Sequence, residues 1–101
     1  MVWDLRGALL KKGEFESARL ATFEFRQRVR AFRLLAEAIG EDADELARRT
    51  VRTPDDELLA TLEADRPDRA GTLAALLAQC QAEARVQLVA ELGDPTPTRL
   101  L

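Results

Sequence analysis

The sequence predicts a small all-α helical bundle in which two long antiparallel helices are accompanied by two or three short ones. Apolar residues recur at spacings of three and four along most of the chain, and no segment alternates apolar and polar residues as a half-buried strand does. Glycine or proline separates the periodic segments. The 101 residues suffice for one hydrophobic core, which we expect within a single domain at 1–92, followed by a tail at 93–101.

The first long helix is expected at Glu14–Ile39, after a short helix at Met1–Lys12 that Gly13 ends. Its main apolar row alternates steps of three and four residues, as a heptad pattern does. The members of this main row are Phe15, Ala18, Thr22, Phe25, Val29, Phe32, Ala36 and Ile39. Gly40 follows, and glycine readily adopts the left-handed backbone that ends many helices.

The same helix carries a second apolar row, about half a turn away at roughly 100° per residue. Its members are Leu20, Phe23, Ala31, Leu34 and Ala38. A helix at the surface of a domain needs only one apolar row. Two rows therefore predict that this helix is covered on both sides.

The middle of the chain predicts two short helices. Asp42, with Glu45 three residues later, has the pattern of a capping box and opens a helix that extends to about Thr50. Thr53 followed by Pro54 then predicts a second N-cap with proline at the first helical position. Acidic residues follow each of these starts, where the helix dipole favours negative charge.

The last helix is expected from Asp68 or Arg69 to Leu92, between the break that Pro67 imposes and Gly93. Its main apolar row consists of Ala70, Leu73, Leu77, Cys80, Ala84 and Leu88. A second row of mostly small residues consists of Ala75, Ala78, Ala82, Val86 and Val89.

Composition argues against catalysis by this chain. Histidine is absent and Cys80 is the only cysteine, so a nucleophilic thiol would lack its usual base. The acidic clusters at 41–45 and 55–57 lack the loop glycine of an EF-hand and lie where helices begin. We therefore expect no enzymatic activity, no cofactor and no metal site.

Charge and hydropathy set expectations about location. The net charge of −3 gives no overall attraction to nucleic acid or to an anionic membrane. The first residues lack a basic stretch followed by an apolar run, so we expect no secretion signal. No window approaches the roughly 20 apolar residues of a membrane span. A single cysteine fits a reducing compartment, so we expect a cytoplasmic protein with no membrane contact.

Each long helix has an apolar row that the short helices have too few large residues to cover. We predict that this surplus forms a subunit interface, most simply in a two-fold homodimer. The chain would then act as a non-enzymatic interaction or regulatory module that uses a helix surface. The candidate interface residues are Leu20, Phe23, Leu34, Val86 and Val89.

The alternative prediction is a nucleic-acid-binding regulator. An arginine ridge lies between the two apolar rows of the first long helix, and its members are Arg19, Arg26, Arg30 and Arg33. Guanidinium groups bind phosphate and carboxylate through paired hydrogen bonds. The same arginines are also typical of a solvated helix flank, in which they pair with glutamates at helical spacing.

Residues 32–51 resemble the helix-turn-helix motif of bacterial repressors. The resemblance depends on Leu35, Ala36, Ile39, Gly40 and Leu46. It implies DNA binding, but Glu41 and Arg49 occupy positions that are usually apolar. Acidic residues also open the would-be recognition helix, where they would repel phosphates. The other interpretation is a pair of helices joined by a glycine turn, with no role in DNA binding.

Overall fold

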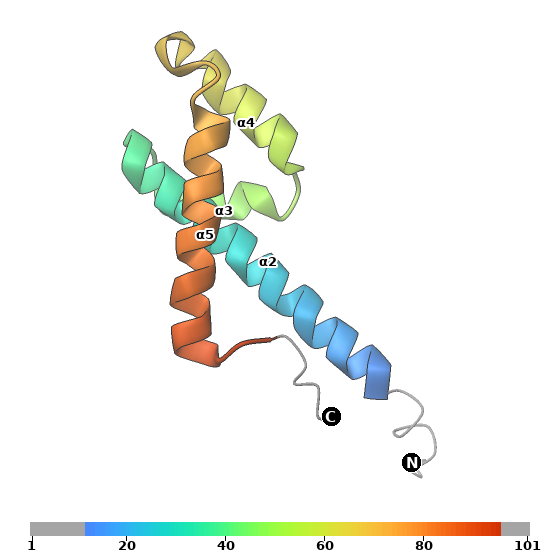
Figure 1. Cartoon of the computed structure of the whole chain (residues 1–101). Coiled ribbons are helices and arrows are strands. Elements are labelled where there is room, and N and C mark those ends of the chain that lie inside the picture. Colours follow the sequence, from blue (N-terminus) through green and yellow to red (C-terminus); the bar gives the residue numbers. More distant parts are fainter. Residues whose placement is uncertain (1–11, 96–101) are drawn as a thin grey trace.

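The computed structural model describes the backbone of residues 12–95 and the side chains of residues 19–95. Within this range the chain is all-α, as the sequence predicts, and contains no strand (Figure 1). The elements are α2 (Lys12–Ile39), α3 (Ala43–Thr50), α4 (Asp55–Ala64), the 3₁₀ turn η1 (Pro67–Arg69) and α5 (Leu73–Leu92). The short helix expected before Gly13 lies outside the described residues, apart from Lys12. The prediction that Gly13 ends a helix is wrong, because α2 begins at Lys12 and contains Gly13.

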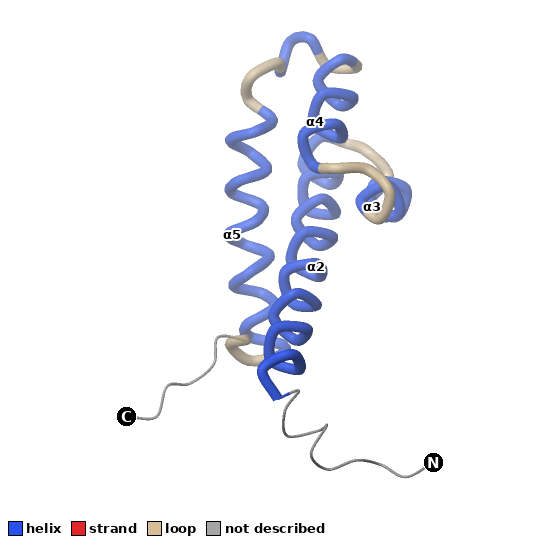
Figure 2. The backbone as a smooth tube through the Cα atoms, turned by 90° about the vertical axis from the view of Figure 1, so that its right-hand side faces the viewer, coloured by secondary structure: helices blue, strands red, loops and turns tan. Residues whose placement is uncertain are grey.

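The two long helices, α2 and α5, form the framework of the fold. They run in opposite directions and cross obliquely in Figure 1, and the view turned by 90° shows them side by side (Figure 2). Ala31 of α2 and Ala84 of α5 are fully buried, and small residues of this kind allow helices to approach closely. Between the same helices, Gln27 donates a hydrogen bond of 3.0 Å to the backbone carbonyl of Gln81.

Helix α3 packs on the C-terminal part of α2. Asp42 caps it, because its carboxylate accepts a hydrogen bond of 3.1 Å from the backbone N–H of Glu45, which confirms the predicted start. The Glu45 side chain does not complete a capping box and pairs with Arg48 instead. The buried residues of α3 are Leu46, Ala47 and Thr50.

Helix α4 closes one end of the long pair and buries Leu58 and Leu62 in the common core. It begins one residue later than predicted, with Pro54 in place of Thr53 at the N-cap. Arg28 of α2 holds this start in place, because its guanidinium pairs with the Asp55 carboxylate and donates a hydrogen bond of 2.5 Å to the Thr53 carbonyl. The ion pair thus connects α2 with the start of α4.

The predicted start of the last helix is wrong. Pro67–Arg69 forms a separate 3₁₀ turn, and α5 begins only at Leu73. Between them Gly71 has a φ of 86°, which an α-helix cannot contain. The predicted ends of the two long helices are correct: Gly40 and Gly93 have φ values of 79° and 84° directly after α2 and α5.

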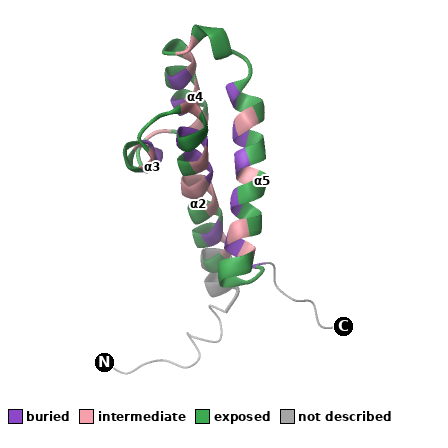
Figure 3. Cartoon of the chain, turned by 90° about the vertical axis from the view of Figure 1, so that its left-hand side faces the viewer, coloured by how far each residue is buried: buried purple, intermediate pink, exposed green. Residues whose placement is uncertain are grey.

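The two apolar rows of α2 change roles along the helix. Toward its C-terminal end, Phe32 of the main row and Ala31 of the second row are both fully buried. Toward its N-terminal end, Phe23 of the second row is only 5% exposed, whereas Phe25 of the main row is 44% exposed. Buried residues line the facing sides of the helices in Figure 3. The main row therefore emerges at the surface where α3 no longer covers it.

Candidate protein-binding surface

An apolar strip with a basic rim lies on the outside of α2. Phe25 and Val29 stand between two grooves, one of about 270 Å³ toward α5 and one of about 470 Å³ toward α3. Leu88 and Leu92 line the first groove, and Ala47 and Val51 line the second. We call this surface the Phe25 face, and its apolar members are Phe25, Val29, Ala47, Val51, Leu88 and Leu92.

The Phe25 face exists because α3 is shorter than the row that it covers. With 8 residues, α3 spans about 12 Å at 1.5 Å per residue. It shares the core with Phe32 and Ala36 of the main row. Val29 and Phe25 continue the same row toward the N-terminus, where Val29 is half-buried and Phe25 is 44% exposed.

Positive charge is concentrated around the Phe25 face. Six arginines line its two grooves and an adjoining groove at the end of α3, together with only three carboxylates. The face therefore carries an excess of three positive charges in a chain whose net charge is −3. The arginines are Arg26, Arg30, Arg33, Arg48, Arg49 and Arg52, and the acids are Asp44, Glu45 and Glu91.

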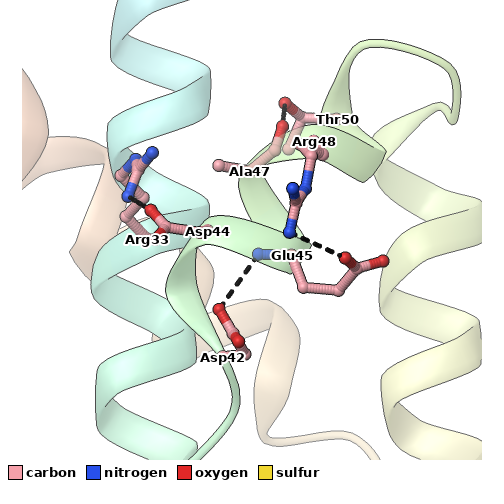
Figure 4. A network of polar contacts seen from close by, with 7 residues as sticks. All are labelled: Arg33, Asp42, Asp44, Glu45, Ala47, Arg48 and Thr50. Atoms are coloured by element: carbon pink, nitrogen blue, oxygen red, sulfur yellow. Dashed lines mark hydrogen bonds and ion pairs between the residues drawn. The ribbon is translucent and has the colours of Figure 1, made fainter.

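Half of these arginines pair with carboxylates of the chain. Arg33 of α2 pairs with Asp44 of α3 at 2.6 Å, and Arg48 pairs with Glu45 at 3.2 Å; both contacts are drawn in Figure 4. The hydrogen bond from Arg33, and then its charge, lower the pKa of the Asp44 carboxyl below its ordinary value. Arg30 pairs with Glu91 of α5. Within the part of the chain that the structure describes, no side-chain hydrogen bond or ion pair involves Arg26, Arg49 or Arg52.

The predicted arginine ridge is divided among different contacts. Arg19 donates a hydrogen bond of 3.2 Å to the backbone carbonyl of Asp94, just after α5. Arg30 reaches α5 and Arg33 reaches α3 through the pairs just described. Arg26 is exposed and lines the groove toward α5 as well as a third groove of about 250 Å³ beside Phe23 and Leu92. Three of the four ridge residues thus connect helices or helix ends, in addition to any external role.

The candidate interface residues differ in how far the structure buries them. Phe23 is buried, with the Arg85 guanidinium 5.6 Å from its ring centroid, so it belongs to the contact between α2 and α5. Val86 is 64% exposed. The half-buried candidates are Leu20, Leu34 and Val89. Phe25, which the heptad pattern places in the main row, is the exposed aromatic that sequence reasoning missed.

The segment that resembles a helix-turn-helix forms the corner between α2 and α3. Leu35, Ala36 and Leu46 are buried and Ile39 is half-buried, so the apolar positions of the resemblance hold this corner together. Acidic side chains occupy its surface. Asp42, Asp44 and Glu45 are all exposed at the start of α3, where a DNA backbone would have to approach.

Other candidate chemistry is sparse in the described part of the chain. Cys80 is 8% exposed, and burial raises the pKa of its thiol, which stays protonated near neutral pH. Among the side chains of residues 19–95, no three acidic or cysteine groups come together as metal ligands do. None of the helices described within residues 12–95 is long and apolar enough to cross a membrane. Neither a protein-family model, nor a curated protein, nor a solved structure matches the chain.

Proposed function

We propose that the protein is a non-enzymatic interaction module that binds a partner protein through the Phe25 face. The observation that carries this proposal is Phe25 itself, an aromatic side chain that is 44% exposed between two grooves. Burying apolar surface yields about 25 cal/mol per Å². Exposed apolar patches with polar rims are typical of protein-binding sites.

The composition of the face supports the same proposal. Its centre is apolar, and arginine, a residue enriched in protein interfaces, makes up most of its rim. Phe25 lies on α2 and Val51 directly follows α3, so the surface depends on the folded arrangement of these two helices. A partner would therefore recognise the folded chain.

The test is affinity purification from cells that make the protein. It compares three full-length baits: the unchanged chain, Phe25→Ser and Val86→Ser. Val86 lies outside the Phe25 face and is also exposed, so its variant controls for the loss of an exposed apolar side chain. Proteins recovered with the first and third baits, but lost with Phe25→Ser, are purified and titrated by calorimetry. We expect Phe25→Ser to bind at least about tenfold more weakly, because a buried aromatic contributes more than 1.4 kcal/mol.

The folding of the variants is followed by circular dichroism. Phe25→Ser should melt close to the unchanged chain, since the side chain is already 44% exposed. If the purified partner binds all three chains equally, or if no protein distinguishes the baits, the Phe25 face is not the binding surface.

A two-fold homodimer through α5 is a second candidate, which Val86 favours. Only three of the 20 residues of α5 are charged: Glu83, Arg85 and Glu91. The apolar residues of α5 are distributed over all sides of the helix, yet Val86 is 64% exposed. Helices that are apolar on all sides are usually covered on all sides. A second copy that covers Val86 and Val89 would supply the missing contact.

A further inference from the structure

We infer that the Phe25 face binds an acidic amphipathic helix, which lies along α2 as a continuation of α3. This inference rests on the proposed function and adds the shape and the charge of the ligand. The shape follows from how α3 already packs on α2, and the charge follows from the arginines around the face.

Helix α3 shows which shape the main row of α2 accommodates. It is itself an amphipathic helix, with Leu46 and Ala47 buried and Asp44 and Glu45 exposed. The row that it covers continues through Val29 and Phe25 with a groove on each side. A second helix can therefore dock on this continuation in the same way as α3 docks on the covered part.

The uncovered part of the row sets the length of the ligand. From Thr22 to Val29, the exposed and half-buried members of the row that the structure describes, the helix rises about 10 Å at 1.5 Å per residue. A ligand of at least about two turns covers this length. Its apolar side chains, spaced by three and four residues, would enter the grooves beside Leu92 and Val51, with Phe25 between them.

The rim of the face selects an acidic ligand. Arg26 is exposed and lines the first groove, whereas the exposed Arg52 and the half-buried Arg49 line the adjoining groove at the end of α3. Arg33 and Arg48 pair with carboxylates in exposed positions, and exposed ion pairs contribute little and exchange readily. The local excess of three positive charges complements a few carboxylates on the ligand, whereas the net negative charge of the chain disfavours them elsewhere.

A nucleic-acid backbone fits this surface less well. The centre of the face is apolar, and Phe25, Val29 and Leu92 have no role in binding phosphates. Asp44 and Glu45 would lie close to such a backbone and repel it. An acidic helix uses both the apolar centre and the basic rim.

The experiment selects 15-residue peptides from a random display library on the full-length chain, with counter-selection on Phe25→Ser. We expect the enriched sequences to carry a net negative charge and apolar residues at spacings of three and four. The most enriched peptide is then labelled and titrated by fluorescence anisotropy. Arg26→Glu should weaken its binding at least fivefold, and Arg69→Glu, an equal change of charge on η1 away from the face, less than twofold.

Each other outcome has a definite meaning. Enriched peptides that are uncharged or basic, but still require Phe25, would overturn the inference about charge while the proposed function stands. If no peptide requires Phe25, the inference about a helical ligand is wrong, and the calorimetry on the purified partner decides the proposed function separately. A DNA duplex or phosphatidylserine vesicles that bind more tightly than the best peptide, and lose binding in Arg26→Glu, would assign the face to phosphate groups.

Discussion

Phe23 and Phe25 are two residues apart on α2, yet one is 5% and the other 44% exposed. Two residues of an α-helix differ by about 200°, so side chains at this spacing point in nearly opposite directions. The sequence periodicity correctly assigns them to different rows. It does not predict which row α5 covers, because both rows contain aromatic and aliphatic residues of similar size.

Among the ion pairs of the Phe25 face, some can be predicted from the sequence and others cannot. Arg48 and Glu45 are three residues apart on one helix, and local spacing rules predict such a pair. Arg30 and Glu91 are 61 positions apart and meet only because α2 crosses α5. The sequence alone therefore predicts a row of arginines but not the carboxylates that neutralise them.

Arg33 should control the titration of Asp44. Its hydrogen bond of 2.6 Å keeps the pKa of this carboxyl below the ordinary value of 3.8. A lowered carboxyl pKa stabilises the fold above the ordinary value, and this stabilisation is lost as the pH falls through the lowered pKa. In Arg33→Met we expect the Asp44 pKa to move back toward 3.8, measured by NMR titration of the carboxyl carbon.

Arg69→Met provides the control, because Arg69 lies on η1 and is absent from the causes that shift this carboxyl. It should leave the Asp44 pKa unchanged. An Asp44 pKa that is the same in the unchanged chain and in Arg33→Met would show that the ion pair does not form in solution.

At the level of elements, helix ends that depend on one residue are predictable from the sequence. Asp42 caps α3, and Gly40 and Gly93 end α2 and α5 as expected. The start of α5 is not predictable in this way, because a glycine is tolerated inside a helix at a modest cost. In the structure Gly71 turns with a φ of 86° and separates η1 from α5.

Gly40→Ala tests the corner between α2 and α3. An added Cβ at Gly40 would meet no atom within 4 Å, so the change acts only through the φ of 79°. A left-handed backbone costs a non-glycine residue about 1–2 kcal/mol. We expect this loss in the free energy of unfolding, measured by urea denaturation.

Gly40→Asn is the matched variant, because asparagine adopts the left-handed conformation more easily than alanine. It should lose less stability than Gly40→Ala. Equal stability of the alanine variant and the unchanged chain would mean that the corner adopts a different backbone in solution.

At the level of the molecule, one buried cluster joins residues from all four described α-helices. It includes Phe32, Leu46, Leu58 and Leu77, one from each helix. Among the described elements, α3 and α4 lie beside the C-terminal half of α2, and the N-terminal part of α2 extends beyond them (Figure 1). The sequence assigns the surplus apolar surface to the second rows of the two long helices. In the structure Val86 of the second row of α5 is exposed, whereas on α2 the exposed aromatic is Phe25 of the main row and Phe23 of the second row is buried.

Val86→Glu tests the proposed dimer through α5. At high micromolar concentration we expect the unchanged chain to sediment as a dimer and the variant as a monomer, because a two-fold contact would bring two carboxylates into an apolar interface. Phe25→Ser, on a different face, should remain dimeric. A monomeric unchanged chain at this concentration would rule out the dimer.

Because α3 leaves the main row of α2 half covered, a ligand docked at Phe25 would extend the hydrophobic core of the protein itself. Binding and folding are then linked: a ligand present at a hundred times its dissociation constant raises the free energy of unfolding by about 2.7 kcal/mol. Chains without a ligand would unfold more often and be degraded first. The cellular abundance of this protein would therefore follow the supply of its partner.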